Sequence, residues 1–411
     1  MEINLIAFTS ELNKPESIWQ AHEVLLSEME KYFKVNIIHY PQLSQLDKQA
    51  FNMVFIASGG TERQFVQCFE QLPHPPVLLT DGLQNSLAAA LEITSWMRQR
   101  GMRTQIIHGN TTKVMIDLMK AYRIWKAMHA LSQKRIGVIG TPSSWLIASN
   151  VDYLLAKRRW GITYTDIPLQ RVYDIYDTIK EEEIGEEASA FASRALACRE
   201  GQPKDLLNAM RLYKAIKQIC LEEKLDALTL SCFTLINKLH TTGCLALSLL
   251  NDDGILAGCE GDLQSIFTLL AANTVTDKIG FMANPSLINE TDNEVVLAHC
   301  TIGTKLTEKF IIRNHFETQS GIAIEGILPT GEITLVKCGG ECLDEYFISS
   351  GQLIENTSYV NTCRTQVRVT LDTSVSYFFR NPIGNHHILL PGRHTDAIKE
   401  LFQYNGCRQI E

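Results

Sequence analysis

The chain has 411 residues, which predicts two or three domains because a typical domain occupies about 150 residues. With 45% hydrophobic and 20% charged residues, it cannot be an intrinsically disordered protein, since enough apolar side chains are present to form a sizeable core. The net charge of −8, from 38 Lys and Arg against 46 Asp and Glu, leaves no excess of basic side chains for a nucleic-acid backbone. We therefore expect a globular protein that binds no nucleic acid.

The sequence predicts a cytoplasmic protein without a membrane segment. No run approaches the about 20 apolar residues that span a bilayer, and the start at Met1 and Glu2 lacks the basic residues of a signal peptide. The 11 cysteines are an odd number without paired spacing, which favours reduced thiols over disulfides. Cys338 and Cys342 have no second pair at zinc-finger spacing, so no structural zinc site is expected.

Alternating strands and helices predict an N-terminal α/β domain over residues 1–131. Short apolar runs indicate the strands, and segments with helical spacing of apolar residues separate them. The predicted elements are a strand at 3–8, a helix at 15–33, strands at 53–57 and 76–79, a helix at 86–100, a strand at 104–108 and a connecting helix at 110–131. This alternation indicates a parallel sheet covered by helices.

A second α/β domain is predicted over residues 132–290, and a β-rich domain over 291–411. The second domain has predicted strands at 135–139, 227–230 and 255–258 and predicted helices at 180–187, 203–224 and 262–273. The last part has short alternating segments rich in β-branched residues at 294–300, 321–326, 333–336 and 366–371, and a final helix at 395–404. The predicted fold class is therefore α/β, with two parallel-sheet domains followed by a β-rich, barrel-like C-terminal domain.

Two glycine-containing turns follow predicted strands. Gly137-Val-Ile-Gly140 lacks the third glycine of a dinucleotide-binding turn, and Trp145 would crowd a pyrophosphate, so we interpret it as a tight turn without a nucleotide. Thr61 and Glu62 end a Ser-Gly-Gly-Thr-Glu segment at the carboxyl edge of the first sheet, where open α/β sheets bind ligands. They are candidates for substrate contact, and the alternative is a loop without a ligand.

The segment Ala257-Gly-Cys-Glu-Gly-Asp262 places two carboxylates between a short strand and a helix. Asp262 is expected to cap the helix that follows, although it could also belong to a site. Glu260 has no partner nearby in the sequence, so its carboxylate must be solvated, paired or bound to a cation.

Histidines later in the chain supply nitrogen donors. His299 lies in an alternating apolar strand, where a satisfied core histidine is the alternative to a ligand. His386 and His387 are adjacent and point to opposite faces if extended, so only one of them can join a given site. His394 is either substrate-facing or a surface residue. One carboxylate, two imidazoles and a further oxygen would suit a divalent ion such as manganese, open to sugar hydroxyls.

At these residues the sequence resembles the L-fucose isomerase and L-arabinose isomerase superfamily of metal-dependent sugar isomerases. The resemblance rests on four motifs in the same order as in that family: Cys259-Glu-Gly-Asp262, Phe281-Met-Ala-Asn-Pro285, Leu297-Ala-His-Cys300 and Asn385-His-His387. The segments that end at Glu62 and Trp145 fit the family more loosely. The two α/β domains followed by a β-rich domain also fit.

The resemblance implies a site for Mn²⁺ or another divalent metal. Its expected ligands are Glu260, His299, His387 and a second acidic residue some two dozen positions after Glu260, where this chain has Asn284. In the family, two carboxylates move a proton between C1 and C2 of the sugar through an enediol. An asparagine offers a carbonyl oxygen to a metal but moves no proton.

Three explanations of Asn284 remain open: a shifted alignment, an isomerase with one carboxylate, or a site that has changed to another sugar reaction or to binding alone. The leading hypothesis is a metal-dependent aldose–ketose isomerase with Glu260 and Asn284 as catalytic-site residues. The alternatives are a non-catalytic carbohydrate-binding or regulatory protein and a metal-free site. Expected partners are a small-molecule sugar and further copies of the chain, as a homo-oligomer (trimer or hexamer). Candidates for sugar contact are Thr61, Glu62, Trp145, His386 and His394.

Overall fold

The computed structural model describes residues 1–10 and 18–411. The chain forms two compact units, Met1–His129 and Ala130–Glu411. Residues 15–17 of the helix predicted at 15–33 lie outside the described part. The predicted domain boundaries near 131 and 290 stay predictions.

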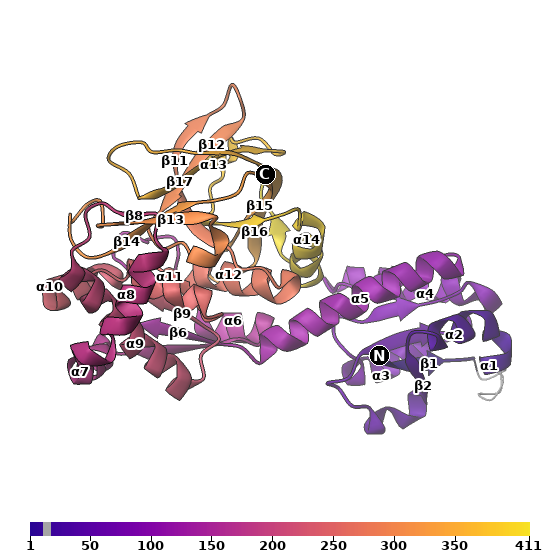
Figure 1. Cartoon of the computed structure of the whole chain (residues 1–411). Coiled ribbons are helices and arrows are strands. Elements are labelled where there is room, and N and C mark those ends of the chain that lie inside the picture. Colours follow the sequence, from indigo (N-terminus) through magenta and orange to yellow (C-terminus); the bar gives the residue numbers. More distant parts are fainter. Residues whose placement is uncertain (11–17) are drawn as a thin grey trace. The chain divides into compact units, whose positions relative to one another are not determined.

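A five-stranded parallel sheet forms the core of the first unit (Figure 1). The strand order is β2-β1-β3-β4-β5, with β1 Glu2–Phe8, β2 Lys34–His39, β3 Asn52–Ile56, β4 Val77–Leu79 and β5 Gln105–Ile107. The helices are α1 Ile18–Ala21, α2 Glu23–Glu30, α3 Glu62–Cys68, α4 Ser86–Gln99 and α5 Thr111–Ser132, which continues into the second unit. The predicted parallel sheet is confirmed. The sequence did not predict the edge strand β2, because the partly buried side chains along this strand give no clear apolar pattern.

The second unit begins with a four-stranded parallel sheet. Its order is β10-β9-β6-β7, with β6 Arg135–Ile139, β7 Thr163–Ile167, β9 Ala227–Leu230 and β10 Leu256–Gly258. The helices of this part are α6 Tyr153–Trp160, α7 Leu169–Thr178, α8 Gly185–Arg194, α9 Pro203–Glu223, α10 Cys232–Leu239, α11 Cys244–Asp252 and α12 Leu263–Thr276. The helix predicted at 180–187 is wrong in extent, since Glu181–Glu183 forms a single 3-10 turn before α8 begins.

Six antiparallel strands close into a barrel in the last part of the chain. They follow the ring order β15-β18-β11-β12-β17-β16, and a further pairing of β15 with β16 closes the ring. Their bounds are β11 Phe281–Asn289, β12 Glu294–His299, β15 Gly331–Gly339, β16 Glu345–Asn356, β17 Thr365–Leu371 and β18 His387–Pro391. The predicted barrel-like C-terminal part, and with it the fold class, is confirmed.

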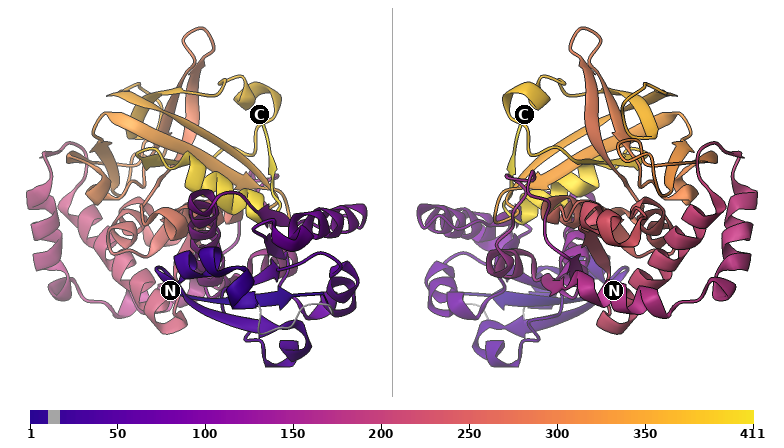
Figure 2. Two further views of the ribbon diagram at one scale, coloured as in Figure 1. Left: turned by 90° about the vertical axis from the view of Figure 1, so that its right-hand side faces the viewer. Right: turned by 90° about the vertical axis from the view of Figure 1, so that its left-hand side faces the viewer.

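Smaller elements complete the second unit. A three-stranded sheet has the order β14-β13-β8, with β8 Ala197–Cys198, β13 Lys309–Arg313 and β14 Ala323–Ile327. The remaining elements are helices α13 Tyr377–Arg380 and α14 Thr395–Tyr404 and strand β19 Arg408–Gln409, which pairs with β16. In both views of Figure 2 the orange and yellow strands gather on one side of the pink helices of this unit.

Helix α12 lies between the parallel sheet and the barrel, and it contacts both (Figure 1). Its first ten residues, from Leu263 to Ala272, are all buried. The turn from β10 into α12 therefore meets the barrel strands at the carboxyl edge of the parallel sheet, a place where α/β folds commonly bind ligands. Across residues 1–10 and 18–411, no helix is both long enough and apolar enough to cross a bilayer.

Candidate functional site

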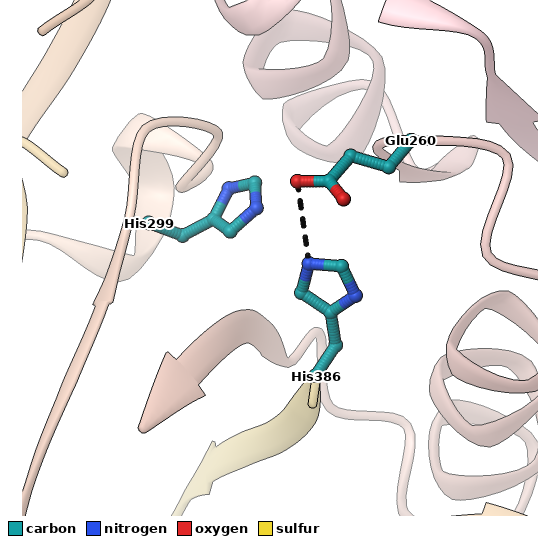
Figure 3. Close-up of side chains that lie close together, drawn as sticks. All are labelled: Glu260, His299 and His386. Carbon is teal, nitrogen blue, oxygen red and sulfur yellow. Dashed lines mark ion pairs between the residues drawn. The ribbon is translucent and has the colours of Figure 1, made fainter. Parts of the chain in front are cut away.

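Three side chains from distant parts of the second unit converge at this junction (Figure 3). Glu260 comes from the turn between β10 and α12, His299 ends β12, and His386 directly precedes β18. One ligand atom of each lies within 4.8 Å of the others, so the three residues form a group that could hold a metal ion. Within this group, His386 Nε2 lies 3.6 Å from Glu260 Oε1.

An uncommon backbone conformation presents Glu260. Its φ is +65°, and the following Gly261 has a φ of +71°. A Cβ atom at Gly261 would lie 2.6 Å from Pro142 Cα, so only glycine fits there. A non-glycine residue in the left-handed region is destabilised, and such residues concentrate at functional sites. The backbone therefore holds Glu260 in this place at some cost in free energy.

The Glu260 carboxylate is ionised and held from two sides. Trp145 Nε1 donates a hydrogen bond to Glu260 Oε2 at 2.7 Å. Burial raises the pKa of Glu260, but the interaction with His386 and the charges of His386 and His299 outweigh it and lower this pKa to about 2. An ionised carboxylate of this kind can bind a cation or accept a proton.

A buried polar network orients His386. Its Nδ1 lies 2.9 Å from Asp262 Oδ2, and both side chains are inaccessible to solvent. Burial lowers the pKa of His386, but Asp262 and Glu260 raise it above its usual value. The Nδ1–H of His386 donates to Asp262, and Nε2 faces Glu260. In metal-binding histidines, a carboxylate partner commonly orients the ring in this way. Cation binding would require Nε2 to release its own proton.

Asp262 has two roles in the fold. Its Oδ1 accepts the Ser265 backbone N–H at 2.8 Å, which confirms the predicted cap of α12. Its Oδ2 faces both His386 and Lys337, whose Nζ lies 3.6 Å away. Lys337 is fully buried, and its Nζ donates to Ser265 Oγ at 2.6 Å. The negative charge that orients His386 is therefore compensated inside the core.

Three polar atoms at the site are buried without a hydrogen-bond partner among the described residues: Asn284 Oδ1, His299 Nε2 and His386 Nε2. The other ring nitrogen of His299, Nδ1, lies 2.9 Å from Thr301 Oγ1. Burial and the charge of His386 lower the pKa of His299 to about 4, so the ring is neutral near pH 7. Since buried polar atoms are rarely left unpaired, these three atoms and Glu260 fit a cation with mixed nitrogen and oxygen ligands.

The group opens into a cavity of about 210 Å³. At about 30 Å³ per water molecule, this volume corresponds to about seven waters, which is enough for a small polar ligand beside a cation. Residues from α10, α11, β11, β12 and several connecting loops line the cavity, among them Glu260, Asn284, His299, Cys300, His315, Phe316, Glu317, Asn361, Thr362 and Cys363. A metal group next to a sugar-sized cavity can bind and polarise a polyol.

The structure places the two adjacent histidines in different surroundings. His386 joins the group with Glu260 and His299, whereas the ring of His387, the expected ligand, packs against Phe347, Tyr377 and Phe378. The Nε2 atom of His387 lies 3.1 Å from the Tyr377 hydroxyl, and its Nδ1 lies 3.1 Å from the Asn385 carbonyl oxygen. Burial lowers its pKa to about 3. The expectation that only one of the pair can join the site agrees with this arrangement.

The other predicted contact residues are placed differently. Trp145 is half exposed and bonded to Glu260. His394 is not brought to the cavity, since it lies at the N-cap position of α14, beyond the far end of β18, and its Nε2 contacts the Pro391 carbonyl oxygen at 3.0 Å. Thr61 and Glu62 belong to the first unit, where the Thr61 hydroxyl donates to the Ser58 carbonyl oxygen at 3.0 Å. Their contact with a sugar stays a prediction.

Three site residues were not found from the sequence. Lys337 carries a signal that could have been used, because it is the one charged residue in the apolar run Leu335-Val-Lys-Cys338 of a strand. His315 and Glu317 carry none, since they lie in a polar loop that reaches the cavity only through the tertiary fold.

Comparison with known proteins finds similarity to isomerases. No protein-family model matches the chain. The sulfoquinovose isomerase of Priestia aryabhattai is 23% identical over 319 residues, which cover 72% of this chain and 69% of that protein. Those of Alkalicoccus urumqiensis and Clostridium sp. (strain MSTE9) are 21% and 24% identical, over 62% and 53% of this chain and 59% and 49% of theirs. These relatives indicate that the chain is an isomerase, as the sequence predicts.

Among solved structures, D-threo-3-hydroxyaspartate dehydratase from Delftia sp. HT23 aligns with 97% of this chain and 85% of its own at 10% identity. The TM-score of 0.16 is too low to indicate a shared fold.

Proposed function

We propose that this protein is a divalent-metal-dependent aldose–ketose isomerase of the fucose and arabinose isomerase type. The observation that carries the proposal is the set of three buried atoms without a hydrogen-bond partner among the described residues, on Asn284, His299 and His386, beside the ionised Glu260 at a sugar-sized cavity. The relatives named sulfoquinovose isomerase support a sugar as the substrate.

The proposed metal ligands are Glu260 through a carboxylate oxygen, His299 and His386 through Nε2, and Asn284 through its carbonyl oxygen. When bound, a divalent cation such as Mn²⁺ supplies Lewis-acid stabilisation for the negative charge that develops on the sugar oxygens. The ligand set carries one carboxylate rather than two. We therefore expect weaker metal binding than a site with two carboxylates would have, because charge on the ligands contributes to cation affinity.

The other residues of the site position this group. Trp145 fixes one oxygen of the Glu260 carboxylate, and Asp262 fixes the ring of His386. In the reaction, Glu260 would take the hydrogen of C2 as a proton and return it to C1. Asn284 binds but moves no proton, because its amide is neither an acid nor a base near neutral pH.

The eleven cysteines are all free, which supports a reducing compartment such as the cytoplasm. A trimer or hexamer remains our expectation for the assembly.

A panel of aldoses that includes sulfoquinovose, fucose and arabinose, incubated with protein and Mn²⁺, tests the proposal by ketose formation. We expect turnover that is lost on chelation and restored by added metal. Glu260→Gln should lower kcat by about 10²-fold or more, since general-base catalysis contributes at least that much. Glu308→Gln, an exposed residue outside the cavity, is the matched control.

Two outcomes would contradict the proposal. Thermal stabilisation by a sugar without any ketose would indicate the alternative, a carbohydrate-binding protein, which the amide at Asn284 favours. Retention of more than about a tenth of kcat in Glu260→Gln would remove Glu260 from the role of base.

A further inference from the structure

The proposed isomerisation moves two protons, and the metal ligands account for only one of them. One hydrogen moves from C2 to C1, and a second moves from the O2 hydroxyl to O1. With an amide at Asn284, a second proton carrier must come from elsewhere in the cavity. The inference below therefore rests on the proposed function and concerns the same site.

Among the described residues that line the cavity, carboxylates occur at two positions, Glu260 and Glu317. Glu317 lies in the loop between β13 and β14, whereas Glu260 lies at the edge of the parallel sheet. A hydrogen bond with Cys300 and burial are the largest effects that raise the pKa of the Cys363 thiol. The charges of Glu317 and Glu260 raise this pKa further, so both carboxylates lie within electrostatic range of one thiol on the cavity wall.

The loop that carries Glu317 is closed by its own hydrogen bonds. The His315 N–H donates to the Ser320 carbonyl oxygen at 3.1 Å, and the Gln319 N–H donates to the His315 carbonyl oxygen at 2.9 Å. Such a turn holds its backbone in one place. The exposed side chain of Glu317 within it can accept and donate a proton.

Arg364 ties this loop to the neighbouring wall of the cavity. Its Nε donates to the Asn314 carbonyl oxygen at 2.9 Å, and its Nη2 donates to Asn314 Oδ1 at 2.5 Å. Arg364 directly follows Cys363, which also lines the cavity. Arg364 therefore joins the segment that contains Cys363 to the loop that carries Glu317. The position of Glu317 thus depends on this contact as well as on the hydrogen bonds within its own loop.

Two other titratable groups nearby, Asp262 and His315, are committed to other partners. Asp262 is fully buried and already accepts from Ser265 and faces His386 and Lys337, so it cannot reach a sugar. His315 packs its ring edge-on against Phe233, and its Nδ1 lies 3.2 Å from Thr318 Oγ1.

We propose that Glu317 is the second proton carrier of the isomerase and compensates for the amide at Asn284. While Glu260 removes the C2 hydrogen as a proton, the Glu317 carboxylate accepts the O2 hydroxyl proton and delivers it to O1. Glu260 then returns its proton to C1. The C2–H and O2–H bonds break, the C1–H and O1–H bonds form, and both carboxylates end as they began, so no oxidant or reductant is needed.

The test compares Glu317→Gln with the matched control Glu308→Gln on a sugar that the wild-type protein converts, with Mn²⁺ present. We expect Glu317→Gln to lose about 10²-fold or more in kcat, while KM, Mn²⁺ affinity by calorimetry and the thermal midpoint stay near the wild-type values. Adding Asn284→Asp to Glu317→Gln should restore at least part of the lost kcat, because it returns a carboxylate to the cavity.

The outcomes distinguish a failure of the role of Glu317 from a failure of the proposed function. Wild-type protein that makes no ketose from any sugar refutes both. If the wild-type protein turns over a sugar and Glu317→Gln keeps more than about a tenth of its kcat, the role of Glu317 is refuted but the proposed function is not. A loss in His315→Gln but not in Glu317→Gln would move the role to the histidine.

Discussion

Replacing Lys337 by methionine tests the buried network behind the site. Lys337 is fully buried, 3.6 Å from Asp262 Oδ2, and its burial lowers its pKa although Asp262 raises it. For Asp262 the balance is the reverse: burial raises the pKa, but Lys337 and His386 lower it well below its usual range. For Lys337, the effect of burial on the pKa is therefore larger than the effect of Asp262. For Asp262, the neighbouring cationic groups outweigh burial, so its charged form depends on them.

The expected magnitude follows from this asymmetry. Removing one member of a buried ion pair costs about 3–5 kcal/mol, because the other charge is left uncompensated. Asp262 keeps its hydrogen bonds from Ser265 and its contact with His386. We therefore expect Lys337→Met to lower the free energy of unfolding by about 3 kcal/mol, near the low end of that range.

Urea unfolding of the metal-free protein, followed by circular dichroism and by the fluorescence of buried Trp160, measures this loss for the second unit. Lys157→Met is the control, since Lys157 is exposed on α6 and surface changes usually stay within about 0.5 kcal/mol. The double variant with Asp262→Asn should recover much of the stability, because a neutral pair replaces the stranded charge. A Lys337→Met protein within about 1 kcal/mol of the wild type would refute this account.

Two further predictions concern the histidine pair and acid stability. His386→Gln should weaken Mn²⁺ binding by at least about tenfold in calorimetry, whereas His387→Gln should leave binding near the wild-type value and lower the thermal midpoint; equal losses of affinity would contradict the assignment. Burial raises the pKa of Asp253, but Lys217 and Tyr213 lower it below its usual value. Asp253 therefore stabilises the fold above its unfolded pKa of about 3.9 and loses this effect as the pH falls. Asp253→Asn should lose less stability than the wild type between pH 5 and 2.5, and parallel acid-unfolding curves would rule this out.

The elements that the sequence predicts well are those with a local physical signal. The strand at 255–258 and the helix from Asp262 are confirmed by β10 and α12, because a short apolar run, a glycine turn and a capping aspartate act within a few residues. The final helix is confirmed over the predicted 395–404, where one apolar face repeats with helical spacing.

Two of the elements that the sequence did not predict, α11 and β16, are buried over much of their length. All nine residues of α11 are buried, so no apolar face alternates with a polar one. In β16, six consecutive residues from Tyr346 to Gly351 are buried, and the alternation expected of a half-exposed strand is lost. Their identity as helix and strand depends on what surrounds them.

The same division holds within the site. The residue types, their order along the chain and the family resemblance led us to propose Glu260, Asn284 and His299 as site residues and to expect that only one of two adjacent histidines could join them. The packing of the barrel against α12 places His386, and not His387, beside Glu260 and His299. The packing of the β13–β14 loop likewise brings Glu317 to the cavity from a segment without any local signal. Spacing along a chain determines conformation over a few residues, whereas the meeting of residues more than a hundred positions apart is a property of the packed fold.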